Sequence, residues 1–319
     1  MINWGIIGYG RMGKIFASCF DSSDKSFDLK GIASKSNFSS NQKIKTFKNY
    51  NDLINSSNID ALYISTLNNT HKDLVLNSIN QNKKILCEKP LGLNFKEVKE
   101  IYDLINGKKN IFFEAVAYRS HPQTSKLLEI LKDKSFGQIK KIEANFGFKV
   151  KRIKKDSRLF NKYLGGGSIL DLGCYPISFF TLFVDKLEDI EIIESNYSLC
   201  ETEVDIDAEI HLKLNNKIDA IGKVSLAENL DNICKIYCED ATLTVPSPWL
   251  PPKKTFLEIE TKGRYFKEFI NSNKNVYDHQ ISEISKSFEG KNEDNPSLVN
   301  IEKSLEISRI LDEWLKSKN

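Results

Sequence analysis

Three glycines near the start of the chain are spaced for holding a phosphate. Gly8, Gly10 and Gly13 form G-x-G-x-x-G directly after the apolar run 3–7 and lead into the apolar-periodic segment 12–20. In such a strand-to-helix turn the first glycine allows the tight turn, the second lets the backbone approach a pyrophosphate, and the third lets helix and strand pack closely. The free N–H groups of the first helical turn then face the anion. The pattern in this context predicts a dinucleotide-binding unit rather than an ordinary strand-to-helix turn.

A hydroxyl and an ammonium group occur at the position where such a unit contacts the ribose of its dinucleotide. The segment 27–34 has the pattern of a second strand, and Ser34 and Lys35 follow Gly13 by about 20 residues. NAD-binding versions carry Asp or Glu here, whereas a hydroxyl beside a positive charge suits a 2′-phosphate. The sequence therefore predicts NADP in preference to NAD. The alternative is that Lys35 is a solvated loop lysine.

A second candidate for chemistry is Glu88-Lys89-Pro90, directly after the predicted strand 84–87. Open α/β sheets bind ligands at the carboxyl ends of their strands. Pro90 holds the preceding residue in an extended geometry and permits a cis bond, which would aim Lys89 in one direction. A catalytic lysine and a plain loop both fit this spacing. His71 begins a helix after another strand, and it is either a cofactor contact or a structural residue.

The glycine-rich segment 164–176 interrupts the strand pattern of the second half of the chain. Its three glycines give a backbone that can fold closely over a ligand, and Ser168 is a candidate helix N-cap. Asp171 and Tyr175 are four residues apart and therefore share one helical face. The plain alternative is a capping box formed by Ser168 and Asp171, with Tyr175 in the core. Pro176 inside the helical run favours a functional irregularity.

Two patterns of apolar residues predict the elements that position these groups. Strands and helices alternate up to Ala115, which predicts a parallel sheet. Beyond Ala117, the segments 142–148 and 206–214 place an apolar residue at every second position, as antiparallel strands do. Further elements are expected as strands near 190–199, 218–226, 232–245 and 256–260 and as helices over 121–134, 277–289 and 297–316.

The predicted fold class is therefore α/β. A Rossmann-type, doubly wound parallel sheet comes first, and an α+β domain with a large, mostly antiparallel sheet follows. The predicted domains are 1–119, which binds NAD(P), and 120–319, which binds substrate and dimerises. The final helix is expected to pack back on the first domain.

Composition excludes several other classes of function. The 319 residues carry a net charge of +3 without a basic block, which argues against nucleic-acid and membrane surfaces. The six cysteines form no C-x-x-C and no secretory signal precedes the first strand, so we expect reduced thiols in a cytoplasmic protein. No apolar run is long enough for a membrane span. The four histidines lack ligand spacing, so no metal is expected.

Five motifs together resemble the Gfo/Idh/MocA family of NAD(P)-dependent oxidoreductases. They are G-x-G-R-M-G at 8–13, T-x-N-x-x-H at 66–71, E-K-P at 88–90, E-A-x-x-x-R at 114–119 and G-G-G-S-x-L-D-L-G-C-Y-P at 165–176. The resemblance extends to the closing helix, where 304–313 is similar to that of the family. Tyr175 stands where many branches have histidine. The segment around it resembles the subgroup of dihydrodiol dehydrogenases, D-xylose 1-dehydrogenases and glucose-fructose oxidoreductases.

The resemblance implies a catalytic pair of Lys89 and Tyr175, with Asp171 orienting the substrate. Hydride leaves a carbinol carbon while the hydroxyl proton leaves too, so a base must lie within hydrogen-bond reach. A nearby ammonium favours the phenolate of Tyr175 and lowers its pKa. In the reverse direction Tyr175 would protonate the developing alkoxide. Lys89 would also bond the nicotinamide ribose and the reacting oxygen.

The resemblance also implies a set of binding residues. The expected cofactor contacts are Gly8, Gly10, Arg11, Met12, Gly13, Ser34, Lys35, Thr66, Asn68, His71, Glu88 and Lys89. Arg119 and Arg158 are expected to line the substrate pocket, although surface or interdomain salt bridges would explain them equally well. The lysine-rich segment 151–156 leaves room for an acidic substrate such as a uronate or a phosphorylated sugar, and it also fits a solvated charge run.

We therefore expect an NADP-preferring oxidoreductase that acts on a sugar or a vicinal diol. The resemblance suggests a homodimer formed through the outer face of the antiparallel sheet. A ligand sensor that binds dinucleotide without catalysis is the first alternative, and the presence of both Lys89 and Tyr175 argues against it. Glycoside cleavage by transient oxidation is a second alternative, which would need a cofactor that stays bound.

Overall fold

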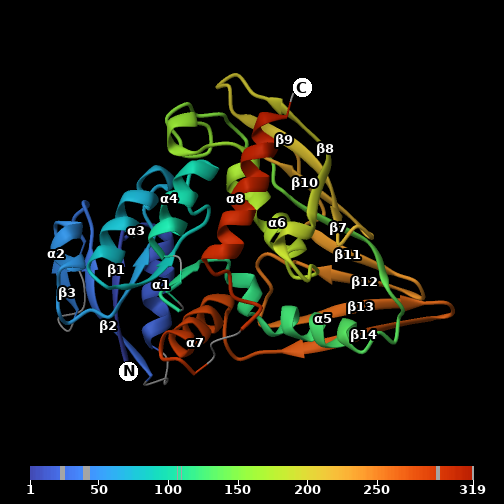
Figure 1. The fold of residues 1–319 in the computed structure, drawn as a ribbon, viewed down its shortest axis with the longest axis horizontal. Helices are drawn as coiled ribbons and strands as arrows, with labels where there is room; N and C mark the ends of the chain where they lie inside the picture. The colour runs from blue at the N-terminus through green and yellow to red at the C-terminus, as the bar shows by residue number, and fades with distance from the viewer. Residues whose placement is uncertain (22–25, 39–43, 106, 109, 292–294, 318–319) are drawn as a thin grey trace. The chain divides into compact units, whose positions relative to one another are not determined.

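A computed structural model describes residues 1–21, 26–38, 44–105, 107–108, 110–291 and 295–317. The chain forms two compact units, which Figure 1 shows coloured along the sequence. The first unit contains Met1–Val116 and Tyr277–Leu305, and the second contains Ala117–Val276 and the chain from Glu306 onward. The chain therefore returns to the first unit after completing most of the second.

The first unit is built on a parallel sheet of six strands in the order β3-β2-β1-β4-β5-β6. This is the strand order of a dinucleotide-binding Rossmann fold, with the switch point between β1 and β4. The strands are β1 (Ile2–Ile7), β2 (Phe27–Ala33), β3 (Lys45–Phe47), β4 (Ala61–Ile64), β5 (Lys84–Cys87) and β6 (Phe112–Glu114).

Helices cover both faces of this sheet because alternate strand residues point to opposite sides. On one face, Trp4 and Ile6 pack in a core with residues of α1 (Arg11–Ser18) and α7 (Val276–Phe288). On the other face, Ile7 and Leu62 pack with Ile301, the first residue of α8 (Ile301–Lys316), and with residues of three further helices. These are α2 (Tyr50–Ile54), α3 (His71–Asn80) and α4 (Phe95–Ile105). The predicted doubly wound architecture is confirmed.

The segment that returns to the first unit is bonded to the start of the chain. The indole Nε1 of Trp4 donates to Ser285 Oγ at 3.1 Å, and the amino group of Met1 lies 2.9 Å from a carboxylate oxygen of Glu289. Ile281, Ile284 and Phe288 complete the same buried cluster. One face of the first sheet is thus covered by residues from the far end of the sequence.

The second unit contains a sheet of eight strands in the order β14-β13-β12-β11-β7-β10-β9-β8. Neighbouring strands are antiparallel except β7 and β10, which are parallel, so the mostly antiparallel prediction is confirmed. The strands are β7 (Ile139–Gly147), β8 (Ile190–Leu199), β9 (Asp205–Leu214), β10 (Ile218–Ser225), β11 (Ile233–Cys238), β12 (Ala241–Pro246), β13 (Lys254–Thr261) and β14 (Arg264–Asn271).

Two helices lie on the apolar face of this sheet. α5 (Pro122–Lys132) packs against β13 and β14, and α6 (Cys174–Phe180) packs against β7 and β10. His121 caps α5, because its Nδ1 accepts from the backbone N of Gln123 at 3.1 Å. Pro176 and Phe180 lie directly on the sheet at Gly222 in β10, where a Cβ would be 3.4 Å from both side chains. The opposite face carries alternating polar side chains.

The structure corrects three details of the predicted elements. The single strand expected over 232–245 is a hairpin of β11 and β12. The strand β14 was not expected, because its residues are mostly exposed and show no apolar alternation. The last helix, α8 (Ile301–Lys316), begins four residues after the predicted start at Ser297. Within the described ranges, no helix is both long enough and apolar enough to cross a membrane.

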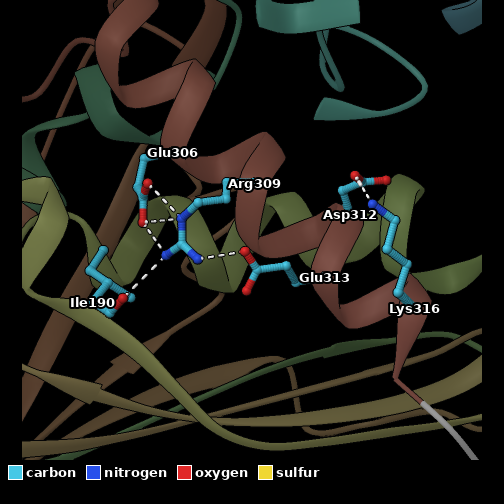
Figure 2. A network of polar contacts seen from close by, with 6 residues as sticks. All are labelled: Ile190, Glu306, Arg309, Asp312, Glu313 and Lys316. Carbon is cyan, nitrogen blue, oxygen red and sulfur yellow. Dashed lines mark hydrogen bonds and ion pairs between the residues drawn. The ribbon is translucent and has the colours of Figure 1, made fainter. Parts of the chain in front are cut away.

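The second half of α8 belongs to the second unit and is fixed there by Arg309 (Figure 2). The guanidinium donates from Nε to Glu306 Oε2 at 2.9 Å and from Nη1 to Glu313 Oε1 at 2.8 Å. It also donates from Nη2 to the backbone O of Ile190 at 3.2 Å. The contact with Ile190 ties α8 to the start of β8, and the carboxylates hold the guanidinium in place.

Candidate active site

The glycine turn between β1 and α1 has the geometry that a dinucleotide phosphate needs. Gly8 has a φ of +90°, and a Cβ at Gly13 would lie 2.2 Å from the Gly8 carbonyl oxygen. At Gly10, a Cβ would meet nothing within 4 Å. Ser65 Oγ donates to the Gly8 carbonyl at 2.8 Å and joins the turn to the end of β4. The residues present therefore fit a pyrophosphate, with open space over Gly10 and the helix start at Arg11 and Met12 beside it.

Ser34 and Lys35 lie beside that turn, at the end of β2. The backbone N of Gly8 donates to the Ala33 carbonyl at 2.9 Å, which places Ser34 at the same edge of the sheet. Ser34 Oγ accepts from the backbone N of Ser36 at 3.2 Å. The Lys35 ammonium lies over the Tyr50 ring, 5.6 Å from its centroid. A contact of these residues with a 2′-phosphate stays a prediction.

His71 joins two loops at the carboxyl edge of the parallel sheet. Its side chain is fully buried, with Nδ1 2.9 Å from the Pro90 carbonyl oxygen and Nε2 3.3 Å from that of Thr66. Burial lowers its pKa, so the neutral ring has one N–H, which donates best to the nearer oxygen. Asn68 begins the short turn that precedes α3. The cofactor contacts predicted for Thr66, Asn68 and His71 stay predictions.

Glu88 and Lys89 follow β5 at the same edge. The Tyr63 hydroxyl donates to Glu88 Oε1, and burial together with the charge of Glu88 raises the pKa of Tyr63 well above its usual value. The Lys89–Pro90 bond is cis, as the sequence allowed. The next residue, Leu91, donates its backbone N–H to Glu114 Oε1 at 3.1 Å. The first unit thus brings the predicted cofactor residues of four loops to one edge of its sheet.

Tyr277 at the start of α7 is a member of this group that sequence reasoning missed. Burial and the charge of Glu88 raise its pKa, and the positive charges of Arg11 and Lys89 oppose that rise. Three predicted site residues therefore act electrostatically on one phenol. Helical periodicity placed Tyr277 in a helix, but nothing in the local pattern indicates its neighbours, because they are more than 180 residues away in sequence.

In the second unit, Asp171 and Tyr175 lie on one irregular helical segment. Residues Ile169–Gly173 form a π-helical turn and α6 follows directly. π-Helical turns inside helices are frequent at functional sites. The irregularity expected at Pro176 is therefore present, just before it.

Asp205, the first residue of β9, holds the beginning of that segment. Its Oδ2 accepts from Ser168 Oγ at 2.7 Å and from the backbone N of Ile169 at 2.6 Å. A Cβ at Gly167 would lie 2.1 Å from Asp205 Oδ1. The plain alternative of a capping box between Ser168 and Asp171 is therefore wrong: the Ser168 hydroxyl makes no capping hydrogen bond and donates to Asp205 instead. Gly167 closes over this buried carboxyl group, whose pKa is raised by burial.

Aromatic rings surround the half-buried Tyr175. Its ring centroid lies 5.0 Å from that of Phe146, 5.7 Å from that of Trp249 and 6.3 Å from that of Tyr118. Trp249 is fixed by a hydrogen bond from Nε1 to the backbone O of Asn145 at 2.8 Å. Sequence reasoning assigned none of these rings to the site. Phe146 was in a recognised alternating segment, whereas Trp249 lies in a loop without a periodic signal.

The second unit also brings Arg158 to Asp171 and Arg119 to α6. Arg158 Nη1 lies 2.7 Å from Asp171 Oδ1. Arg119 is fully buried and donates from Nη1 to the Ser178 carbonyl at 2.7 Å and to Thr181 Oγ1 at 2.8 Å. Burial lowers the pKa of the guanidinium to about 10, so it stays charged at neutral pH. These bonds hold the end of the helix that carries Tyr175, and the substrate contacts predicted for both arginines stay predictions.

Comparison with known proteins decides the family. Residues 2–116 match the model described as "Oxidoreductase family, NAD-binding Rossmann fold", and residues 124–244 match the GFO/IDH/MocA C-terminal domain. A trans-1,2-dihydrobenzene-1,2-diol dehydrogenase of Xenopus laevis is 30% identical over 268 residues, which cover 81% of this chain and 80% of the relative. The chain belongs to the Gfo/Idh/MocA family. It is therefore an oxidoreductase with an NAD(P)-binding Rossmann domain, and the resemblance inferred from its motifs is confirmed.

A second curated relative and two solved structures are also similar to this chain. The diol dehydrogenase of the same name from Xenopus tropicalis is 29% identical over 271 residues, covering 82% of this chain and 80% of the relative. A 3-ketoreductase from Actinomadura kijaniata, solved with NADP and TDP-benzene, has a TM-score of 0.86 at 18% identity and covers 99% and 97% of the two chains. An aldose-aldose oxidoreductase from Caulobacter crescentus has a TM-score of 0.85 at 15% identity, with 99% and 96% covered. The two solved structures share the fold with this chain.

Proposed function

We propose that the protein transfers hydride between NADP and the hydroxyl or carbonyl carbon of a sugar or a vicinal diol. Tyr175 is the acid/base in this proposal, and Lys89 assists it. The environment of Tyr175 is the observation that supports the proposal. Its half-buried phenol lies on an irregular helix and is surrounded by aromatic rings. One helical turn before it, Asp171 forms an ion pair with Arg158. A phenol in such a place has restricted access to water, which strengthens its interactions with a nearby charge.

Each residue has a distinct task in this reaction. The bound nicotinamide supplies the hydride acceptor or donor. Tyr175 takes the proton from the substrate hydroxyl during oxidation and returns it to the alkoxide during reduction. The ammonium of Lys89 favours the phenolate form of Tyr175 and stabilises negative charge on the reacting oxygen. The carboxylate of Asp171 accepts hydrogen bonds from substrate hydroxyls, and Arg158 keeps that carboxylate oriented.

The preference for NADP rests on Ser34 and Lys35. Neither residue offers the carboxylate that would bond a ribose 2′-hydroxyl and repel a 2′-phosphate. The Lys35 ammonium lies over Tyr50 at the end of β2, beside the glycine turn, and from there it offers positive charge at the ribose position. The 3-ketoreductase with the same fold was solved with NADP, and this agrees with the proposal.

The names of the relatives support the proposed substrate class. The curated relatives are named trans-1,2-dihydrobenzene-1,2-diol dehydrogenases, and the structural neighbours are named a 3-ketoreductase and an aldose-aldose oxidoreductase. The aromatic wall around Tyr175 favours a substrate with an apolar face, which both a dihydrodiol and a pyranose ring possess. The carboxylate of Asp171 favours adjacent hydroxyls, which both also possess.

We also propose a cytoplasmic homodimer formed through the outer face of the eight-stranded sheet. On β14, Tyr265 and Phe269 expose 58% and 69% of their surface, although large aromatic rings at an edge strand are usually covered. Light scattering coupled to gel filtration measures the assembly. A monomeric mass at micromolar concentration contradicts the dimer.

The experiment that tests the reaction is the initial rate of NADPH formation over aldoses, uronates and cyclic vicinal diols at mildly alkaline pH, with NAD in parallel. Tyr175→Phe is expected to bind NADPH as the wild type does and to lose turnover. Tyr102→Phe removes the same hydroxyl from α4, outside the candidate site, and is expected to keep full activity. Equal turnover of the Tyr175→Phe variant and the wild type contradicts the proposed role. NADPH binding without turnover of any substrate class favours a regulatory sensor.

A further inference from the structure

The chain makes a sharp turn at Gly167, just before the π-helical turn that carries Asp171. Gly167 has a φ of +114°, and its backbone N donates to the Leu159 carbonyl at 2.9 Å. Its own carbonyl accepts from the backbone N of Asp171 at 3.1 Å. Because Leu159 directly follows Arg158, Gly167 is bonded to both segments that supply the Arg158–Asp171 ion pair. A displacement of Gly167 would therefore change the geometry of that pair.

The side chain of Asp205 holds this turn from the first residue of β9. Its Oδ2 accepts from Ser168 Oγ at 2.7 Å and from the backbone N of Ile169 at 2.6 Å. At the other carboxyl oxygen, Gly167 lies so close that a Cβ there would be 2.1 Å from Oδ1. Asp205 is 2% exposed, and its strand pairs with β8 at Leu199. A residue anchored in the sheet thus contacts three consecutive residues of the turn.

A buried ionisable side chain holds each end of the helical segment 169–180. At its beginning, Asp205 accepts from the first backbone N–H of the π-helical turn. At its end, the fully buried Arg119 donates to the Ser178 carbonyl at 2.7 Å. A negative charge at the N-terminal end of a helix and a positive charge at its C-terminal end both complement the helix dipole. The segment that carries Tyr175 is therefore fixed at both ends.

The stability of the helix alone does not explain a buried carboxyl group at this place. Ser168 lies at the N-cap position, where a serine hydroxyl can satisfy an N–H of the first turn without any buried charge. Here that hydroxyl donates to Asp205 instead. Burial raises the pKa of Asp205, and the Ser168 hydroxyl and the backbone N–H of Ile169 oppose the rise. The arrangement replaces a local cap with a connection to β9, which determines where the helical segment begins.

We propose that Asp205 is a positioning residue of the candidate active site. By holding the turn at Gly167, it sets the position of Asp171 against Arg158. Through the same helical segment, it sets the position of Tyr175. Asp205 acts through these residues and is not itself a catalytic residue. The inference rests on the proposed function and adds to it a residue outside the substrate contacts.

The test compares Asp205→Asn with Asp133→Asn. Asparagine keeps the size of the side chain but replaces one acceptor oxygen with a donor group. For Asp205→Asn we expect KM for the substrate to rise roughly tenfold and kcat to fall on the order of tenfold, because small displacements of binding and reacting groups are costly. Asp133 Oδ1 accepts from the backbone N of Ser135 at 2.6 Å beyond the end of α5. Asp133→Asn thus makes the same change at a second carboxylate of the unit and is expected to leave both constants unchanged.

The value of KM separates a positioning role from a loss of stability. A smaller folded fraction lowers the apparent kcat in proportion and leaves KM unchanged, because the molecules that remain folded are normal. Circular dichroism melting curves give the folded fraction of Asp205→Asn at the assay temperature. A KM equal to that of the wild type overturns the inference, whatever the value of kcat.

A double variant tests whether Asp205 acts through the ion pair. Asp205→Asn combined with Arg158→Gln is expected to have a KM within about twofold of that of Arg158→Gln alone, because a pair that is already broken cannot be misplaced further. KM effects that multiply overturn the inference. If Asp205→Asn does not fold, Ser168→Ala replaces it, since this variant removes one donor and leaves the carboxyl group. A KM raised about threefold is then expected, and a wild-type KM overturns the inference.

Two variants of the ion pair distinguish a failure of the inference from a failure of the proposed function. A wild-type KM in both Arg158→Gln and Asp171→Asn contradicts the substrate contact in the proposed function, and the inference with it. A raised KM in these two variants, beside a wild-type KM in Asp205→Asn, overturns the inference alone.

Discussion

Arg158 Nη1 and Asp171 Oδ1 lie 2.7 Å apart, and the two ends of this ion pair differ in exposure: the side chain of Arg158 is 52% exposed and that of Asp171 is 6% exposed. The guanidinium thus lies between the buried carboxylate and the surface of the unit. If Asp171 binds a substrate hydroxyl as proposed, the ion pair has already oriented the carboxylate, which lowers the entropic cost of forming that hydrogen bond.

Removing the exposed half of this pair should weaken substrate binding more than the chemical step. For Arg158→Gln we expect KM to rise roughly tenfold, since a charge-assisted hydrogen bond contributes on that order, with a smaller change in kcat. Steady-state kinetics on the best substrate provide the measurement. Arg152→Gln, an exposed cation of the same loop, serves as the control. If the effects of Arg158→Gln and Asp171→Asn are additive in the double variant, the pair does not act as a unit.

The open space beside Gly10 allows a substitution that should weaken cofactor binding without affecting folding. A Cβ at Gly10 meets nothing within 4 Å, whereas one at Gly13 would lie 2.2 Å from the Gly8 carbonyl oxygen. Gly10→Ala is therefore expected to keep the thermal unfolding midpoint of the wild type and to weaken NADPH binding at least about tenfold, because the methyl group fills the place of the pyrophosphate. Gly13→Ala should lower the midpoint as well. Calorimetry and NADPH fluorescence measure the two properties. Unchanged affinity in Gly10→Ala would contradict the assigned phosphate position.

The ribose position should control the choice of cofactor. Ser34→Asp combined with Lys35→Ala puts a carboxylate where we expect the 2′-phosphate and removes the ammonium. We expect the ratio of kcat/KM for NADP to that for NAD to fall roughly ten- to hundredfold. Ser36→Ala is the control, since Ser36 contributes only its backbone N–H to Ser34. A ratio that does not move would show that other residues read the ribose.

The raised pKa of Glu114 should make the stability of the folded chain depend on pH. Burial raises the pKa of Glu114 from its ordinary value of 4.5 to about 7 in the folded chain, so the folded state binds this proton more tightly than the unfolded state does. The resulting stabilisation is complete below pH 4.5 and is lost as the pH rises through 7. Glu114→Gln lacks this loss, so its unfolding free energy should gain up to about 3 kcal/mol on that of the wild type between pH 5 and 8. Urea unfolding at several pH values measures the difference, and parallel curves would contradict the assignment.

Structural features formed by residues close together in sequence could be predicted, whereas contacts between residues far apart in sequence could not. The turn at Gly8–Gly13 and the period-two strand over 206–214 carry their signal within a few residues, and both are present in the structure. Asp205 begins a strand and accepts from Ser168, which is 37 residues away. No periodicity encodes that contact, so Ser168 was given the local role of a cap.

The candidate site shows the same limit. Asp171 and Tyr175 could be found because a glycine-rich run and an interior proline interrupt the strand pattern around them. The rings of Phe146 and Trp249 come to Tyr175 from a strand and a loop, and their place depends on the packing of the sheet. Glu114 lay inside a recognised motif, but its burial and its hydrogen bond from the Leu91 N–H depend on the packing of β6 beside the loop after β5.

The return of Tyr277–Leu305 to the first unit has a consequence for how the protein is made. Ile281, Ile284 and Phe288 complete the apolar layer that covers Trp4 and Ile6, and Ser285 bonds the Trp4 indole. While the ribosome is still synthesising the second unit, one face of the parallel sheet lacks part of its cover. The sheet that is translated first is therefore among the last parts of the protein to be completed. A fragment that stops at Val116 would expose this apolar face to other chains.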